Sequence, residues 1–297
     1  MTGTVDAHLH LWRLPRTAGD SPYAWVTPEL GELHRDYLPP EAARELVAAG
    51  IERAVLVQAD DTLADTQFLL DVSARHPWAV GVVGWVPLDE PAQAAQALDR
   101  WQAHPAFVGV RHLVHDDPRP DFLRLPAVRE SLRLLAARGV PFDVPDAYPR
   151  HLDQVAALVE EVEELTVVVD HLAKPPLADG PGSAAFTEWE ALLRRVAHVP
   201  RSVAKVSGLR VPGARYDAAT LRPAVDVALD AFGPSRLMYG GDWPMTVPHG
   251  GYRPTLAVLR DVLAELSAAD AAHIWHDTAI RVYGLPAAGG ADLPAGG

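Results

Sequence analysis

The feature that most constrains the fold is a regular alternation of short apolar segments with longer amphipathic segments along most of the chain. The apolar segments are continuous rather than interrupted by polar residues, which is typical of parallel strands covered on both faces. We expect strands at 5–10, 53–58, 79–85, 107–112, 140–144, 166–170, 202–206 and 236–240. Helices are expected between them at 40–47, 61–72, 91–101, 128–137, 152–162, 189–197 and 221–232. Eight strands that alternate with helices predict a closed (β/α)8 TIM barrel.

The 297 residues suffice for one such barrel, because α/β barrels commonly form a single domain of ~250 residues. We expect one domain at 1–285, followed by a flexible tail at 286–297 that is rich in glycine, proline and alanine. A long loop is expected at 11–38, directly after the first strand, and it carries Trp25 among other aromatic residues. A loop of this length either covers a binding pocket or packs its aromatic side chains on the barrel rim. The sequence leaves both alternatives open.

Charge and composition exclude several classes of partner. The formal net charge is −13 and no cluster of lysine or arginine occurs, whereas nucleic acids and anionic membranes require a basic patch. The absence of cysteine excludes disulfides and thiolate chemistry. The first residues lack the pattern of a signal peptide, and no apolar run reaches the ~20 residues of a membrane span. We expect a cytoplasmic protein that acts on a small molecule, with a homo-oligomer left open.

Two histidines end the first expected strand. His8 and His10 are two residues apart, so both imidazoles point to the same side of the strand. In a TIM barrel, the active site lies at the C-terminal ends of the strands, where this pair is found. Neutral histidine is the commonest nitrogen ligand of zinc-like ions, so the pair is a candidate metal site. For an isolated His-x-His, one core histidine and one loop histidine are the more common situation.

Asp242 follows the last expected strand, and His171 ends the sixth. Across the barrel mouth from the histidine pair, a carboxylate can bind a metal ion through one oxygen and accept a proton from water through the other. The alternative for Asp242 is a turn-capping role before Trp243. His171 is a candidate third nitrogen ligand or a group that polarises a substrate carbonyl. The candidate metal ligands are therefore His8, His10, His171 and Asp242.

Polar residues at the remaining strand ends are candidates for substrate binding. Arg111 ends the fourth strand, where a guanidinium group either binds an anionic group of a substrate or pairs with a strand-end acid such as Asp143. Gln58, Trp85 and Lys205 are weaker candidates, because each can either line the pocket or pack the barrel mouth. Lys174 can form a salt bridge near the rim and is given no catalytic role. The candidate substrate-binding residues are Arg111, His112, Gln58, Trp85, Lys205 and Trp25.

The strand-end motifs together resemble those of a known family. They are His-x-His at 8–10, Val-Leu-Val-Gln at 55–58, Val-Gly-Trp at 83–85, Gly-Val-Arg-His at 109–112, Asp-His-Leu-x-Lys-Pro at 170–175, Lys-x-Ser-Gly-Leu at 205–209 and Gly-x-Asp-Trp-Pro at 240–244. The set is similar to that of the amidohydrolase superfamily, and within it to the amidohydrolase-2 group of sugar and dicarboxylate lactonases. That group includes L-fuconolactonase, L-rhamnonolactonase, sulfomuconolactone hydrolase and pyrone-dicarboxylate lactonase. The resemblance extends from Val5 to Leu285.

The resemblance implies roles for the candidate residues. Asp242 is then the general base, and Arg111 helps to hold the substrate. The three histidines form a metal site or its vestige: one divalent ion is implied, with zinc first, although some lactonases of this group work without metal and polarise the carbonyl with histidines directly. Neither lysine nor histidine ends the fifth strand, where binuclear relatives hold a bridging ligand, so a two-metal site is not expected.

Two departures from the group's pattern lie at the expected barrel mouth. Gly241 stands where serine is common, and Pro145 and Asp146 occur in the fifth-strand stretch, where relatives often run apolar. Both departures bear on the substrate more than on the reaction.

The expected activity is hydrolysis of a small cyclic ester, a sugar lactone or a related hydroxy-acid lactone, by water with Asp242 as the base. Two alternatives stay open. One is metal-dependent decarboxylation of a small aromatic or dicarboxylic acid, and the other is a barrel that binds a metabolite without catalysis.

Overall fold

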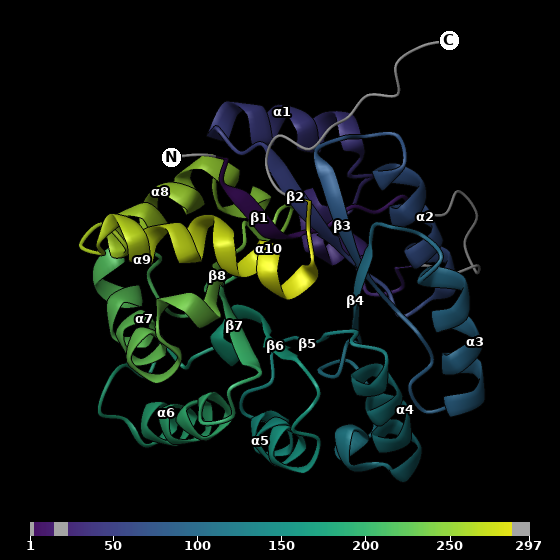
Figure 1. Cartoon of the computed structure of the whole chain (residues 1–297). Helices are drawn as coiled ribbons and strands as arrows, with labels where there is room; N and C mark the ends of the chain where they lie inside the picture. Colours follow the sequence, from purple (N-terminus) through teal and green to yellow (C-terminus); the bar gives the residue numbers. More distant parts are fainter. Residues whose placement is uncertain (1–2, 15–22, 287–297) are drawn as a thin grey trace.

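A computed structural model of the chain describes residues 3–14 and 23–286. Its eight parallel strands form one sheet, ordered β1 to β8 as in the sequence, which curves into a barrel (Figure 1). The (β/α)8 TIM barrel predicted from the sequence is therefore confirmed. The strands are β1 (Val5–Leu9), β2 (Arg53–Val57), β3 (Ala79–Gly84), β4 (Phe107–Arg111), β5 (Phe142–Val144), β6 (Val167–Val169), β7 (Ser202–Val206) and β8 (Leu237–Tyr239).

The outer layer consists of helices that cover the strands on all sides (Figure 1). Side chains of Thr62, Ser183 and Asp217 accept hydrogen bonds from backbone amides in the first turns of three of these helices. The last two caps explain why these helices begin before the expected 189 and 221, since cap residues set helix starts more strongly than the apolar pattern does. The main helices are α1 (Pro39–Ala49), α2 (Leu63–Ser73), α3 (Pro91–Trp101), α4 (Pro126–Ala137), α5 (Leu152–Glu161), α6 (Ala184–Ala197), α7 (Ala218–Phe232) and α8 (Tyr252–Val262).

Several shorter helices occur in the connections and after α8. None of these, nor α8 itself, was among the helices expected from the sequence. They are η1 (Pro28–Leu33), η2 (Phe122–Arg124), η3 (Asp170–Ala173), η4 (Pro234–Arg236), η5 (Val247–His249), α9 (Ala268–Ala272), η6 (His273–Asp277) and α10 (Thr278–Tyr283). No helix in the described part of the chain is long and apolar enough to cross a membrane.

The barrel is joined between its first and last strands just beyond the end of β8. The backbone amide of Asp242 donates to the carbonyl of His8 (2.7 Å), and the amide of His10 donates to the carbonyl of Trp243 (2.7 Å). These bonds hold the segment after β8 against the C-terminal end of β1. The barrel closure therefore places Asp242 beside the two histidines.

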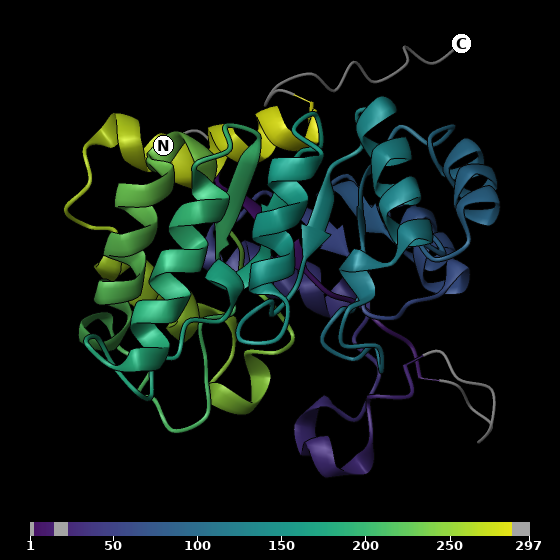
Figure 2. The same ribbon diagram turned by 90° about the horizontal axis from the view of Figure 1, so that it is seen from below.

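The opposite end of the barrel is plugged by the last helix. Ala279 and Tyr283 of α10, together with Leu285, are buried against the inward-facing side chains of the strands, such as Val57 and Met238. Figures 1 and 2 show α10 lying across this N-terminal end of the barrel, far from the segment around η1. Access for a ligand is therefore confined to the C-terminal end of the strands.

The described part of the loop after β1 both packs on the barrel and reaches inward. Trp12 forms edge-to-face contacts with Trp25 and Tyr37, at centroid distances of 5.4 and 5.0 Å, and Tyr37 contacts Trp243 at 5.2 Å. Trp25 also lines the cavity described below. Residues 15–22 of this loop and 287–297 of the expected flexible tail lie outside the described residues, so the tail stays a prediction.

Candidate active site

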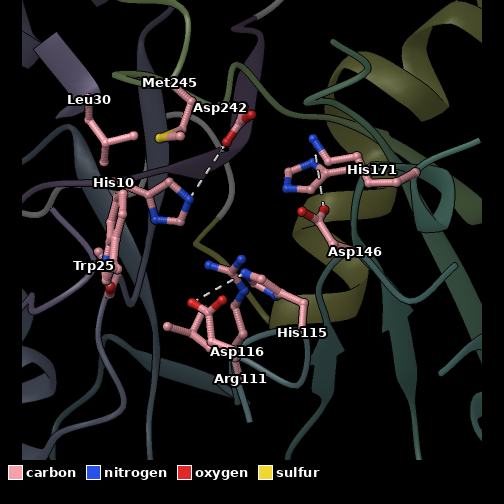
Figure 3. A pocket seen from close by; sticks show the side chains of 13 residues that line it. His10, Trp25, Leu30, Arg111, His115, Asp116, Asp146, His171, Asp242 and Met245 are labelled. Atoms are coloured by element: carbon pink, nitrogen blue, oxygen red, sulfur yellow. Dashed lines mark hydrogen bonds and ion pairs between the residues drawn. The ribbon is translucent and has the colours of Figure 1, made fainter. Parts of the chain in front are cut away.

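A cavity of about 300 Å³ lies at the C-terminal end of the barrel (Figure 3). Its wall is formed by the loop after β1 and by the segments that follow β2, β4, β5, β6 and β8. This end of a TIM barrel holds the active site in essentially every characterised enzyme of the fold. The lining residues are His10, Trp25, Leu30, Ala59, Arg111, Leu113, His115, Asp116, Asp146, His171, Lys174, Asp242 and Met245.

Three histidines meet at the bottom of the cavity. The Nε2 atoms of His8 and His10 are 3.0 Å apart, and the rings of His8 and His171 are 4.6 Å apart between centroids. All three side chains are buried. Burial lowers the pKa of His8 to about 3 and lowers the pKa of His10 and of His171 well below the usual value. Near neutral pH, the cluster therefore consists of uncharged imidazoles, which can accept hydrogen bonds or bind a metal ion.

Two of these rings are oriented by hydrogen bonds to their Nδ1 atoms. His10 Nδ1 lies 2.8 Å from the carbonyl oxygen of Val57, so it carries the proton and leaves Nε2 with a lone pair. His171 Nδ1 lies 2.8 Å from the hydroxyl oxygen of Ser207. His171 itself has a φ angle of 56°, in the left-handed region that non-glycine residues rarely occupy. Such conformations persist where surrounding contacts enforce them, and they cluster at functional sites.

Asp242 lies beside the histidines with one carboxylate oxygen toward them. Its Oδ1 atom is 3.9 Å from His8 Nε2 and 3.7 Å from His10 Nε2. The residue is buried, and burial raises the pKa of its carboxyl group to about 7. A carboxylate with such a pKa accepts a proton more readily than an exposed one and is still substantially ionised at neutral pH. Its φ angle of 53° is also left-handed.

The turn before Asp242 is held by a buried carboxylate on β1. Asp6 accepts hydrogen bonds from the backbone amide of Gly241 (2.7 Å) and from the hydroxyl of Tyr252 (2.7 Å). A Cβ atom at Gly241 would lie 2.5 Å from Asp6 Oδ2 and 2.5 Å from a ring carbon of Tyr252. This crowding accounts for glycine at position 241.

Below the histidines lies a buried group of charged residues. Lys205 Nζ is 2.6 Å from Asp143 Oδ2, 3.0 Å from Asp170 Oδ1 and 3.1 Å from His8 Nδ1. Arg111 Nε is 3.2 Å from Asp170 Oδ2. Burial opposes ionisation of Asp170, but the charges of Lys205 and Arg111 and the contact with His8 hold its pKa well below the usual value. Arg111 is thus paired with a strand-end acid and also lines the cavity.

His8 has two hydrogen-bonding arrangements open to it. In the first, Lys205 donates to His8 Nδ1, and His8 Nε2–H donates to His10 Nε2. In the second, His8 Nδ1–H donates to Asp170 Oδ1, which is 3.3 Å away, and Nε2 carries a lone pair. A ring nitrogen that binds a metal must be unprotonated, and the other nitrogen commonly donates to a carboxylate. The second arrangement is the one compatible with a metal ion.

The donor set fits one divalent ion. His8, His171 and Asp242 each offer a ligand atom, and these atoms lie within 4.8 Å of one another. His10 Nε2 is adjacent, since it lies 3.0 Å from His8 Nε2. Uncharged imidazoles with one carboxylate are typical ligands of zinc, and the oriented second nitrogens of His10 and His171 are typical of metal-binding histidines.

The structure brings together some of the sequence-predicted residues and not others. His10, Trp25, Arg111, His171 and Asp242 line the cavity, and His8 lies directly below. The four remaining candidates do not line it, so their positions lend no support to a substrate-binding role. Gln58 contacts Asp61 and the carbonyl of Arg111, Trp85 donates to His112 Nδ1 (3.1 Å), His112 stacks on Phe122, and Lys205 is fully buried below His8.

Four polar residues of the cavity wall were not predicted as site residues. His115 and Asp116 follow β4, and Asp146 follows β5 (Figure 3). Lys174 follows β6. They lie two to five residues beyond the strands. The sequence contained one signal, because Asp146 belongs to the fifth-strand stretch that departs from the family pattern. Lys174 belongs to the Asp-His-Leu-x-Lys-Pro motif at 170–175, but it was given no role in the site. His115 and Asp116 carry no local pattern that distinguishes them from ordinary loop residues.

A family model described as Amidohydrolase (Amidohydro_2) matches residues 5–285. This chain belongs to the amidohydrolase family. The resemblance drawn from the strand-end motifs is therefore confirmed. The prediction that the protein is a hydrolytic enzyme is confirmed with it.

Known relatives of this amidohydrolase extend over nearly its whole length. An L-fucono-1,5-lactonase from Burkholderia ambifaria is 34% identical over 250 residues, which cover 83% of this chain and 82% of that protein. A second L-fucono-1,5-lactonase, from Burkholderia multivorans, is 33% identical and covers 95% and 96% of the two chains. A crystal structure of an amidohydrolase from Burkholderia multivorans with bound zinc has 32% identity and a TM-score of 0.85, covering 96% of this chain and 100% of that one. A 2,6-dihydroxybenzoate decarboxylase, at 18% identity and a TM-score of 0.64, shares the fold alone.

Proposed function

We propose that this amidohydrolase hydrolyses a neutral sugar lactone, with L-fucono-1,5-lactone as the first candidate. The observation that carries the proposal is the position of Asp242. Its buried carboxylate, with a pKa raised to about 7, lies 3.7 and 3.9 Å from two uncharged imidazoles at the bottom of the cavity. The L-fucono-1,5-lactonases among its relatives support the choice of substrate.

The residues supply each proton transfer that ring opening requires. Asp242 accepts a proton from water as the water oxygen attacks the lactone carbonyl carbon. The imidazoles of His8, His10 and His171 surround the space where the carbonyl oxygen becomes negative, and an N–H among them stabilises that charge. The ring C–O bond then breaks, and Asp242 returns its proton to the leaving alkoxide. When bound to His8, His171 and Asp242, a divalent ion such as zinc would polarise the ester carbonyl as a Lewis acid.

The charges of the cavity wall favour a neutral polyhydroxy substrate over a dicarboxylate. The wall carries three carboxylates, those of Asp116, Asp146 and Asp242, and two cations, Lys174 and Arg111. Arg111 is already paired with a buried acid, and Lys174 lies 3.8 Å from Asp146 Oδ1. To bind the carboxylates of a dicarboxylate lactone, this wall would need an arginine or lysine that is not already close to an acid.

Unpartnered atoms on the wall suit sugar hydroxyls. His115 Nδ1 and Asp146 Oδ1 are buried and have no hydrogen-bond partner among the described residues. A hydroxyl group both donates and accepts, so the ring hydroxyls of an aldonolactone can satisfy such atoms. We therefore expect sugar lactones to be better substrates than dicarboxylate lactones. The same charge pattern disfavours decarboxylation of a dicarboxylic acid, and we do not propose it.

A panel of lactones tests the proposed function. Proton release would be followed with a pH indicator for L-fucono-1,5-lactone, other neutral aldonolactones and a pyrone dicarboxylate, with and without prior chelation. We expect turnover of a neutral 1,5-lactone well above its spontaneous rate and a lower kcat/KM for the dicarboxylate. The chelated sample shows whether a metal ion is required. Preference for the dicarboxylate, or release of carbon dioxide from a carboxylic acid in place of lactone turnover, would contradict the proposal.

The rate of hydrolysis should depend on pH through Asp242. Burial raises the pKa of this carboxyl group to about 7, and only its ionised form accepts a proton from water. As the pH falls through 7, the ionised fraction falls, so we expect kcat/KM of the metal-free enzyme to fall about tenfold per pH unit below the pKa. The histidines, with lowered pKa values, stay uncharged over this range. A pH profile from 5.5 to 8.5, corrected for spontaneous hydrolysis, measures the effect, and a flat profile would contradict it.

A further inference from the structure

A second cavity, of about 130 Å³, adjoins the first behind Asp242, and we call it the side cavity. Lys174, Asp242 and Met245 line both cavities. Figure 3 shows Asp242 and Met245 on this part of the wall of the first cavity. A cavity of this size holds about four water molecules at the ~30 Å³ that each occupies in the liquid. It can therefore admit a carboxylate group, although a whole sugar acid does not fit.

Three side chains of the side cavity have polar atoms without partners. Arg210 Nε, the hydroxyl of Tyr216 and the hydroxyl of Thr246 are shielded from solvent and make no hydrogen bond to the described residues. Buried polar groups are nearly always hydrogen-bonded, because an unpaired one loses its bonds to water without replacement. One N–H donor and two hydroxyls in one cavity indicate a ligand that accepts hydrogen bonds.

The side cavity is also more basic than the first cavity. Lys174 and Arg210 line it, and Asp242 is the one carboxylate among its lining residues in the described chain. The guanidinium of Arg210 stacks on the ring of Tyr216 at 4.2 Å, and its NH2 group donates to the carbonyl of His249. Neither contact neutralises its charge. An arginine that is held on an aromatic face with a free N–H edge is suited to a planar carboxylate.

Asp242 lines both cavities, and its two carboxylate oxygens have different neighbours. Oδ1 is the oxygen nearest the histidines, whereas Oδ2 faces Gly208 in the wall of the side cavity. A Cβ atom at Gly208 would lie only 2.7 Å from Asp242 Oδ2 and 2.3 Å from His171 Nδ1. The backbone at Gly208 thus passes close to the reaction centre because it carries no side chain. A group formed at the lactone carbonyl carbon is therefore close to the side cavity.

We propose that the side cavity binds the carboxylate group of the ring-opened product, an inference that rests on the proposed lactone hydrolysis. Water adds one oxygen to the carbonyl carbon, the ring C–O bond breaks, and the ring oxygen leaves as a hydroxyl group. The new carboxylic acid releases its proton to solvent at neutral pH. The resulting negative charge is repelled by Asp116 and Asp146, which line the first cavity but not the side cavity, and is attracted by Arg210, which lines the side cavity but not the first.

Isothermal titration calorimetry with sodium L-fuconate tests this proposal on the intact enzyme. L-Fucose, which has the same configuration at C2 to C5 but forms a closed ring and carries no carboxylate, is the neutral comparison. We expect Arg210→Gln to weaken L-fuconate binding at least about tenfold and to leave L-fucose binding unchanged, because the lost bond is to a charged group. Product inhibition of lactone hydrolysis by L-fuconate should weaken by the same factor. Tyr216→Phe and Thr246→Val, each of which removes one hydroxyl, should act in the same direction.

Arg215→Gln is the matched control. Arg215 lies in the same loop as Arg210 and Tyr216, but its side chain is 88% exposed, so its removal changes the net charge equally without touching the side cavity. We expect it to leave L-fuconate binding unchanged. If the melting temperature shows that Arg210→Gln does not fold, the binding of L-fuconate and L-fucose is compared in Thr246→Val instead.

Several outcomes would overturn the proposal. They are no detectable binding of L-fuconate to the wild-type enzyme, unchanged binding in all three variants, and equal loss of L-fuconate and L-fucose binding. A lowered kcat with unchanged L-fuconate binding would instead assign the side cavity to water that takes part in the reaction. Absence of lactone turnover by the wild-type enzyme would overturn the proposed function, and with it the product assignment, independently of the calorimetry.

Discussion

Replacement of Asp242 by asparagine should reduce lactone turnover at least ~100-fold, the usual scale for loss of a general base. The amide is nearly identical in shape to the carboxylate but cannot accept a proton from water. The backbone bonds that hold this residue beside β1 come from the peptide amide of Asp242 and the carbonyl of Trp243, so they persist in the variant. The loss should appear in kcat rather than KM, because the proton transfer occurs in the transition state.

Asp116→Asn is the matched control for this variant. Asp116 lines the same cavity, but its side chain is 55% exposed and its carboxylate pairs with His115 at 3.7 Å. We expect its effect on kcat to be below tenfold. Thermal melting of both variants checks that the fold is retained. Turnover of Asp242→Asn within tenfold of wild type would refute the assignment of Asp242 as the base, without affecting the family or the fold.

The fold could be predicted from the sequence because its determinants are local. Continuous apolar segments such as 53–58 and 107–112 alternate with amphipathic ones, and this order alone defines a parallel barrel. The boundaries were less accurate where a cap residue, such as Ser183, starts a helix ahead of its apolar pattern. The plug formed by α10 was missed, because its role comes from contact with the barrel interior and not from its own sequence.

The candidate site could be predicted only as far as the strand ends. Once the barrel is known, His10, His171 and Asp242 must meet, since the C-terminal ends of all strands share one face. The loop residues His115 and Asp116 escaped prediction because tertiary contacts fix the path of a loop. Lys205 was a weaker candidate for the substrate, with packing at the barrel mouth as the alternative, and its substrate role stays a prediction. It precedes the end of β7 and is fully buried below His8.

The buried position of Lys205 leads to the largest expected change in stability. Its ammonium group is fully buried and contacts Asp143 and Asp170 at 2.6 and 3.0 Å. Tyr283 of α10 also donates to Asp143 Oδ2 (2.7 Å), so this group of charges connects the plug to the active-site histidines. Lys205→Met should lower the free energy of unfolding by about 3–5 kcal/mol, because it leaves two carboxylates close together without their shared cation. Urea unfolding at pH 7 measures this loss.

Two further variants distinguish two causes of the stability loss in Lys205→Met, an unpaired buried charge and a packing defect. The double variant Lys205→Met, Asp143→Leu should recover much of the stability, because Asp170 keeps Arg111 as its partner. Lys174→Met, which removes a half-buried lysine that lies 3.8 Å from Asp146 and donates to the carbonyl of Gly208 (2.6 Å), should cost about 1 kcal/mol, well below the cost of Lys205→Met. A double variant that is less stable than Lys205→Met would indicate a packing defect instead.

The stability that Lys205→Met loses relative to wild type should also depend on pH. The direction follows from the linkage between proton binding and folding. Burial already raises the pKa of Asp143 to about 6 when Lys205 is present. Loss of the lysine charge raises the pKa values of Asp143 and Asp170 in the folded variant above those in the folded wild type, so the folded variant binds protons more tightly. Stability of Lys205→Met relative to wild type should therefore increase as the pH falls from 8 to 5. The wild-type protein lacks this recovery at Asp170, whose pKa the contact with Lys205 holds well below its usual value. A stability difference that is constant over this range would show that the buried charges do not determine the effect.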